Sequence, residues 1–150
     1  MPLSDFIQQH STSILTQAIQ SVQRAQLPHY PATSPEMVQE RLSRLLELTG
    51  QAVHSHDLGH LTEYARKLGE ERFQQGFPLS EVQTAINVLE EAIWDHCVRL
   101  LPGDQLGNAL GLCSTALGAT KDCLARTYVS LASGVHVSSL NLQALFEGVE

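Results

Sequence analysis

Hydrophobic residues recur along most of this chain at steps of three and four, which is the spacing of helices that bury one face. In residues 3–26 this spacing explains most of the apolar positions, whereas the alternation of a strand does not. Further segments repeat the helical pattern, and we predict helices over about 35–53, 57–75, 80–100 and 104–134. The pattern therefore predicts an all-α fold, a bundle of about five or more helices with a long C-terminal helix.

Proline and glycine separate the predicted helices. Residues 27–35, LPHYPATSP, contain three prolines and are predicted to form a loop, after which Thr33 or Ser34 caps the next helix. Gly76 suits the end of the third helix, and Pro78 or Ser80 begins the fourth. We expect one helical domain over 1–135. Residues 136–150 would form an extension or tail that continues the long helix, packs as a short amphipathic helix, or frays.

The long helix carries two different lines of residues. One is an apolar seam at alternating steps of three and four, suited to lie along another helix: Leu106, Leu110, Cys113, Leu117, Thr120, Leu124, Tyr128 and Leu131. The other is a line of small residues that would let a neighbouring backbone approach closely: Gly107, Gly111, Ser114 and Gly118. Both lines favour a homodimer, and both are equally compatible with packing inside one chain.

Composition and charge narrow the classes of partner. Hydrophobic residues make up 43% of the chain, which is enough for a core. With 16 acidic residues against 9 Lys and Arg, the formal charge of -7 disfavours binding to nucleic acid or to an anionic membrane. The start lacks the pattern of a signal peptide, and no apolar stretch is long enough to span a bilayer. Cys97, Cys113 and Cys123 are odd in number and suggest reduced, packed thiols of a cytoplasmic protein, with conditional disulfides left open.

The sequence HDLGH, residues 56–60, is the first candidate for chemistry. His56 and His60 are four residues apart, at which spacing two imidazoles on a helix can hold zinc, and Glu63 has the best local spacing for a third ligand. Asp57, however, is a methylene shorter than the glutamate that activates water in zinc proteases of similar pattern. The simpler interpretation is a helix junction capped by Ser55 or Asp57. A metal-dependent hydrolase on His56 and His60 is therefore the least favoured hypothesis.

A second candidate is His96, which falls on or beside the apolar face of the fourth helix. In an all-helical domain such a histidine can be the proximal ligand of a haem. Since nothing else marks a haem pocket, a packed histidine bonded to a backbone carbonyl, or to Glu90 or Glu91, is favoured. A haem- or small-ligand-binding protein using His96 remains the runner-up hypothesis. The leading hypothesis is not an enzyme and needs no cofactor, because the chain lacks a nucleophile elbow and a phosphate-binding glycine loop.

Residues 64–96, YARKLGEERFQQGFPLSEVQTAINVLEEAIWDH, show a more specific order. A helix of the form A-x-x-x-x-x-x-R ends in Q-G-F-P-L, then come S-E-V-x-x-A and L-x-x-A-I-W. This order resembles the N-terminal sensor domains of RsbR-type stressosome proteins, a non-haem, globin-like family also found ahead of some bacterial histidine kinases. The helix pattern on both sides is compatible with the resemblance over about 1–135. The residues that carry the corner are Arg72, Gly76, Phe77, Pro78, Leu79, Ser80 and Glu81.

The corner has a physical interpretation of its own. Gly76 would end one helix, Phe77 and Leu79 would fill the corner with apolar side chains, and Ser80 with Glu81 would cap the next helix. Arg72, one turn earlier, is expected to bond the carbonyls at the helix end. These residues would fix the angle between two helices and carry out no chemistry.

The resemblance implies a globin-like fold and a bacterial signal-transduction module that dimerises and passes a change of state to an output domain. In that family the last helix commonly continues into the output domain, which this chain does not contain. We therefore expect a cytoplasmic sensory or regulatory domain that acts as a homodimer, or by binding a protein partner in a signalling pathway.

Overall fold

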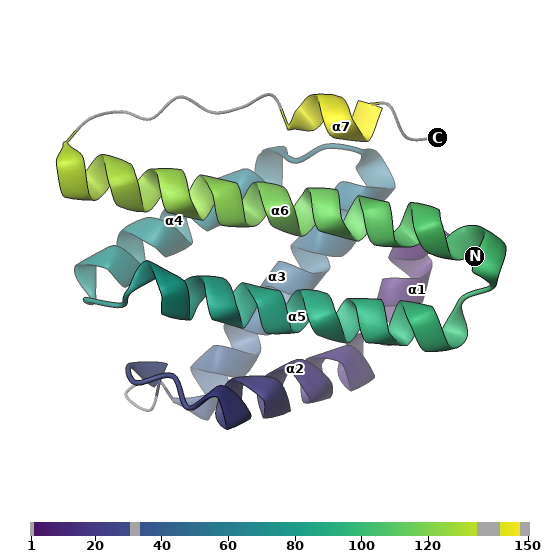
Figure 1. The fold of residues 1–150 in the computed structure, drawn as a ribbon, viewed down its shortest axis with the longest axis horizontal. Helices are drawn as coiled ribbons and strands as arrows, with labels where there is room; N and C mark the ends of the chain where they lie inside the picture. The colour runs from purple at the N-terminus through teal and green to yellow at the C-terminus, as the bar shows by residue number, and fades with distance from the viewer. Residues whose placement is uncertain (1, 31–33, 135–141, 148–150) are drawn as a thin grey trace.

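The computed structural model describes residues 2–30, 34–134 and 142–147 of the chain (Figure 1). Its elements are α1 (Leu3–Gln9), α2 (Ser11–Ala25), α3 (Pro35–Ser55), α4 (Gly59–Gln74), α5 (Leu79–Leu100), α6 (Gly103–Ser133) and α7 (Gln143–Glu147), with no strand in the described segments. The predicted all-α, globin-like bundle with a long C-terminal helix is thus confirmed. Across these same segments, no helix combines the length and apolarity needed to cross a membrane.

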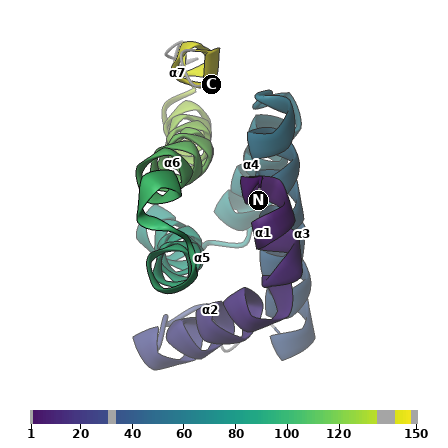
Figure 2. The ribbon, with the colours of Figure 1, turned by 90° about the vertical axis from the view of Figure 1, so that its right-hand side faces the viewer.

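The helices form two layers, and α2 lies across one edge of both (Figure 2). Helices α5 and α6 run antiparallel in one layer, and α3, α4 and α1 form the other (Figure 2). Helix α2 crosses below both layers and contacts α5 and α3. The core between them is apolar, and its largest fully buried members are Phe146, Ile14, Leu61, Ile86, Leu89, Ile93, Leu117 and Leu124.

The prediction of one helix over 3–26 is wrong, because the chain breaks at His10. His10 has φ -104° and ψ 13°, and separates α1 from α2. Between Ile7 and Ile14 no apolar residue is present to hold a continuous helix against the core. The serine and threonine residues in that stretch are also poor helix formers. As a result α1 packs on α3, whereas α2 turns to pack on α5.

The other helix ends lie close to the predicted ones. Ser34 is the N-cap of α3 and its side chain accepts a hydrogen bond of 3.2 Å from the backbone N–H of Met37, with Pro35 in the first turn. Thr33, the alternative cap, lies outside the described residues. All three cysteines are free and buried, as expected of packed thiols.

Helix α6 turns its two lines of residues in different directions. The middle of the apolar seam, Cys113, Leu117, Thr120 and Leu124, is completely buried inside the chain. The small residues face the other way, and a Cβ added at Gly107, Gly111 or Gly118 would meet no atom within 4 Å. The close approach of two helices is made elsewhere, at Gly69 of α4, where an added Cβ would lie 3.0 Å from Cγ2 of Thr127.

The chain returns to the bundle after α6. Of the predicted tail, residues 136–141 and 148–150 lie outside the described residues, and residues 142–147 contain the short helix α7. Phe146 of α7 is completely buried and its ring lies 6.0 Å from that of His56. The side-chain amide of Gln143 accepts from the N–H of Leu58 at 3.0 Å and donates to the carbonyl of His56 at 2.6 Å. Helix α7 therefore packs on the junction between α3 and α4.

Candidate functional site

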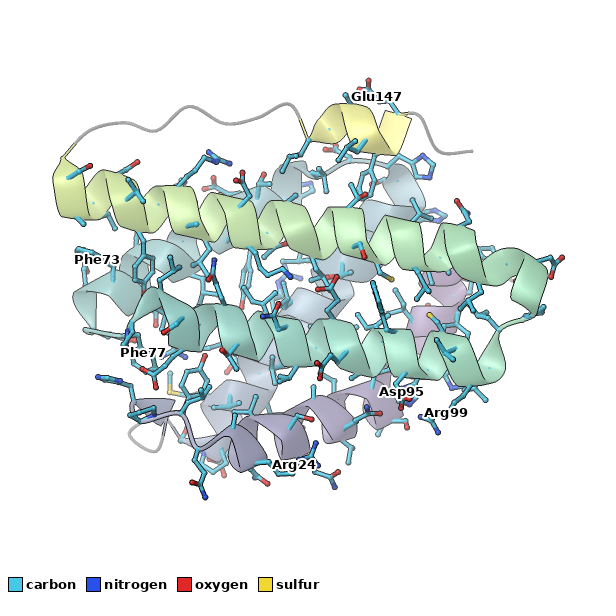
Figure 3. All side chains as sticks on the ribbon, viewed as in Figure 1. Arg24, Phe73, Phe77, Asp95, Arg99 and Glu147 are labelled. Carbon is cyan, nitrogen blue, oxygen red and sulfur yellow. The ribbon has the colours of Figure 1, made fainter. Side chains whose placement is uncertain are left out.

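The corner between α4 and α5 is closed by a Schellman motif. Gly76 takes a left-handed conformation with φ +81°, which glycine adopts without steric cost. The N–H of Phe77 donates to the carbonyl of Arg72 at 3.0 Å, and the N–H of Gly76 donates to that of Phe73 at 3.1 Å. These two backbone hydrogen bonds satisfy carbonyls in the last turn of α4 and end the helix. The aromatic rings of Phe73 and Phe77 lie at this end of the bundle (Figure 3).

Helix α5 begins at one of its two predicted starts, but without the predicted side-chain cap. Its N-cap is Pro78, and Ser80 lies inside the helix without capping it, so the cap predicted at Ser80 is wrong. Glu81 is in the first turn, as predicted, but its carboxylate turns to the loop before α3. One oxygen accepts from the backbone N–H of His29 at 2.9 Å and the other from Nδ1 of the same residue at 2.5 Å. Glu81 is buried, and it ties that loop to α5.

Arg72 is the unexpected feature of the corner, since it is only 3% exposed. The carbonyls at the end of α4 are satisfied by backbone groups, so the predicted bonds from Arg72 to helix-end carbonyls are not formed. Instead Nη1 donates to the side-chain oxygen of Gln75 at 3.1 Å, and the guanidinium lies 4.2 Å from the ring centre of Phe77. Burial, followed by the nearby charge of Arg41, lowers the pKa of Arg72.

Tyr128 links α6 to the α4–α5 corner. Its hydroxyl donates to the carbonyl of Phe77 at 2.7 Å, and its ring meets that of Phe73 edge-on at 5.5 Å. Burial raises the pKa of Tyr128 to about 12, although the charge of Arg72 opposes the shift. The neutral phenol is therefore the form that the folded protein favours.

Replacing Tyr128 with phenylalanine is expected to lower the free energy of unfolding by about 1 kcal/mol at pH 7, because the Phe77 carbonyl loses its donor. A phenol whose pKa is raised in the folded state stabilises the fold below the unfolded pKa of about 10 and loses that contribution as pH rises toward 12. Urea titrations at pH 7 and pH 11 should show a shallower alkaline loss for Tyr128→Phe. Tyr64→Phe, which removes a longer 3.3 Å bond to the Arg41 carbonyl, is the control and should lose less.

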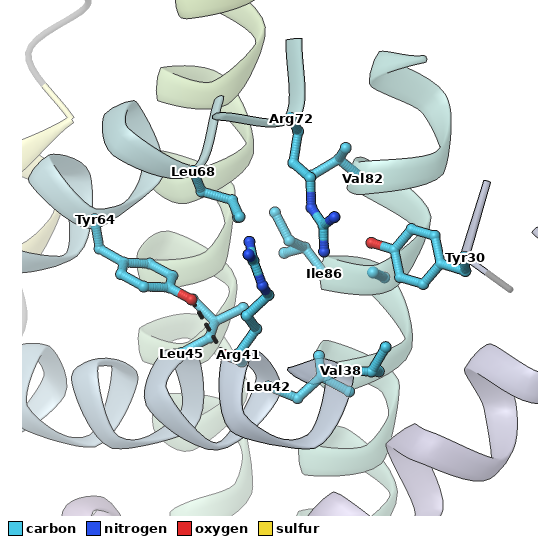
Figure 4. A pocket seen from close by; sticks show the side chains of 11 residues that line it. Tyr30, Val38, Arg41, Leu42, Leu45, Tyr64, Leu68, Arg72, Val82 and Ile86 are labelled. Carbon is cyan, nitrogen blue, oxygen red and sulfur yellow. Dashed lines mark hydrogen bonds between the residues drawn. The ribbon is translucent and has the colours of Figure 1, made fainter. Parts of the chain in front are cut away.

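Next to the corner lies a small cavity of about 30 Å³ between α3, α4 and α5 (Figure 4). Two guanidinium groups, Arg41 and Arg72, point into it, together with the hydroxyl of Tyr30 (Figure 4). Arg41 forms an ion pair with Glu71, which lowers the pKa of that carboxyl. The rest of the wall is mostly aliphatic: Val38, Leu42, Leu45, Leu68, Val82, Ala85 and Ile86, with Tyr64.

The structure places His56 and His60 on different elements. His56 is the C-cap residue that follows α3, in a left-handed conformation with φ 56°, whereas His60 lies exposed in the first turn of α4. Asp57 accepts a 2.8 Å hydrogen bond from the N–H of Gly59, but the N-cap of α4 is Leu58, which forms no side-chain cap bond. The histidines lie at a helix junction, as the simpler interpretation expects, but the cap predicted at Ser55 or Asp57 is wrong. Among the residues that the structure describes, no three His, Cys, Asp or Glu side chains lie together in a way that could hold a metal ion.

His96 is buried in α5 with both ring nitrogens in use. Nδ1 donates to the carbonyl of Ala92 at 2.7 Å, which leaves Nε2 to accept from the hydroxyl of Ser13 at 2.8 Å. This is the packed histidine bonded to a carbonyl that the sequence favours. Binding a haem iron through Nε2 would require the bond from Ser13 to break.

Sequence reasoning missed the cavity beside the corner. Arg41 falls outside the apolar positions of the helix predicted over 35–53, although its side chain is only 20% exposed and reaches the cavity. For Arg72 a signal was present, because it continues the inward series Leu61, Ala65 and Leu68 at helical spacing. An arginine on an inward face predicts a buried cation.

One of three comparisons with known proteins gives a match. Curated proteins and solved structures give no significant match to this chain. One family model matches residues 13–130, which include α3 to α5, the α4–α5 corner and most of α6. Since the match covers most of the chain, this protein belongs to the family described as the RsbT co-antagonist protein rsbRD N-terminal domain.

Proposed function

We propose that this domain is a non-enzymatic sensory module of a stressosome-type pathway, which works in the cytoplasm as a homodimer that binds a protein partner. The family supports a regulatory role. The α4–α5 corner supports it too, because its residues join helices and bind one another. The homodimer is inferred from the exposed residues on the outer face of the α5–α6 layer.

This outer face consists of Trp94 and Val98 of α5 with Gly107, Gly111, Ser114 and Gly118 of α6. Figure 1 looks onto the layer from the side away from α3 and α4. Trp94 is 40% exposed and Val98 57% exposed, although both are large apolar side chains. Gly107, Gly111 and Gly118 of α6 leave open space where a second backbone could come close. An exposed aromatic anchor next to small residues is a surface suited to a second copy of the same helix pair.

Replacing Gly111 with glutamate should weaken the dimer more than about tenfold, because two-fold symmetry would bury like charges against each other. The fold itself should tolerate the change, since the added Cβ meets no atom within 4 Å. Size-exclusion chromatography with light scattering, over a concentration series, measures the dissociation constant.

Gln105→Glu is the matched control, because it adds the same charge on α6 at a partly exposed position about 120° from Gly111 around the helix. The control should dimerise like the unchanged chain. If the unchanged protein stays monomeric at high micromolar concentration, the dimer is excluded. Equal weakening by both variants would move the interface away from the outer face.

A further inference from the structure

The inference starts from a buried positive charge without a counter-ion. Arg72 is 97% buried, and within the described parts of the chain its Nε has no hydrogen-bond partner and no carboxylate lies within 4 Å of its guanidinium. Its one polar side-chain contact is the neutral oxygen of Gln75, and the faces of Phe77 and Tyr30 lie 4.2 and 5.5 Å away. A buried, unpaired cation costs several kcal/mol, so proteins rarely leave one in place without an anion.

Two carboxylates of the corner region, those of Glu71 and Glu81, are already engaged. Both oxygens of Glu81 accept hydrogen bonds from His29, and Glu71 is held by Arg41. Arg41 and Arg72 together carry two positive charges, of which Glu71 balances one. Among the described residues no carboxylate pairs with Arg72 itself, and a monovalent anion would supply that partner.

The cavity limits the size and shape of that anion. About 30 Å³ exceeds the 10–15 Å³ needed for one water molecule, and accommodates a group of only a few heavy atoms. A guanidinium presents parallel N–H donors that match the two oxygens of a carboxylate. The hydroxyl of Tyr30 points toward the same guanidinium (Figure 4). Val82 and Ile86 add an apolar wall that suits a methyl group.

We propose that the cavity between α3, α4 and α5 is a binding site for a small monocarboxylate, held by Arg72 with Arg41 and Tyr30. The site goes beyond dimerisation and does not depend on it. It is reached from the side of Arg41, whose side chain is 20% exposed, while Arg72 lies deeper. A carboxylate bound here would bridge the guanidiniums of two helices beside the α4–α5 corner.

The test is the stability of the full chain in sodium acetate against sodium chloride at equal ionic strength. With a dissociation constant on the order of 1 mM, 100 mM acetate should lower the unfolding equilibrium constant about 100-fold beyond the effect of chloride. Formate should act like acetate, whereas butyrate should be excluded by size. Binding of ¹³C-labelled acetate, followed by NMR line broadening, gives a second readout that does not require unfolding.

Arg72→Met should abolish both responses, and Arg66→Met is the matched control, because Arg66 lies on the same helix but is exposed and paired with Glu63 and Glu70. If Arg72→Met does not fold, Arg41→Met at the cavity mouth should still weaken acetate binding at least about tenfold. Equal responses to acetate and chloride, or an unchanged response in the arginine variants, would overturn the proposal. Stabilisation by butyrate as strong as by acetate would also overturn it, since the cavity could not be the site.

Discussion

Replacing Leu117 with alanine is expected to lower the free energy of unfolding by about 2–5 kcal/mol. Leu117 is completely buried in the middle of α6, where this helix packs on α4 and α5. Alanine would remove apolar atoms from the core and leave a cavity that rigid helices on both sides can only partly fill. The loss would be a large share of the 5–15 kcal/mol that typically stabilises a domain of this kind.

Urea titration of the variant and of the unchanged chain measures this difference. Leu131→Ala is the matched control, because it is the same substitution on the same helix at a position that is 41% exposed. The control should change stability by less than about 0.5 kcal/mol. Equal losses at the two positions would show that Leu117 is not part of the core.

Replacing Gly69 with leucine is expected to cost about 3 kcal/mol, through crowding of α4 against α6. An added Cβ alone would lie 3.0 Å from Cγ2 of Thr127 and 3.2 Å from Cδ1 of Leu124, and the rest of the leucine would need still more room. The gain in helix propensity on replacing glycine, about 1 kcal/mol, offsets only part of this strain. The helices must move apart, and the Tyr128 bond to the corner would be strained with them.

Gly107→Leu on α6 tests the same substitution where there is space, and should be neutral or stabilising by up to about 1 kcal/mol. Thermal unfolding at low protein concentration keeps association from contributing. A stable Gly69→Leu variant would contradict the close packing of α4 on α6 at this glycine.

The helices that could be predicted from sequence are those with strong local signals. Ser34 with Pro35 begins α3, and Gly76 ends α4, because capping and left-handed turns depend on residues that are adjacent in the chain. The break at His10 could not be predicted from periodicity alone. It depends on whether α2 packs better against α5 than in line with α1, and that is decided by residues far away in the sequence.

The candidate site, too, could be predicted only in part from the sequence. The resemblance identified the corner, and periodicity places Arg72 on its inward side. The residues that line the cavity with Arg72 could not be predicted, because Tyr30 and Arg41 come from a loop and a helix that only tertiary packing brings near α4. The contact of Glu81 could not be predicted either. Its carboxylate binds His29, which lies 52 residues earlier in the sequence, and does not cap its own helix.

The hydroxyl bond from Tyr128 to Phe77 has a mechanical consequence. Helix α6 contains 31 residues and is therefore about 46 Å long. Tyr128 grips the α4–α5 corner near one end of this rod, and the tight turn at Pro102 holds the other end. Tilting the helix by about 2° about that turn would move Tyr128, about 38 Å along it, by about 1.3 Å. A tilt of α6 about that turn would therefore shift the corner that Tyr128 holds, and with it the angle between α4 and α5.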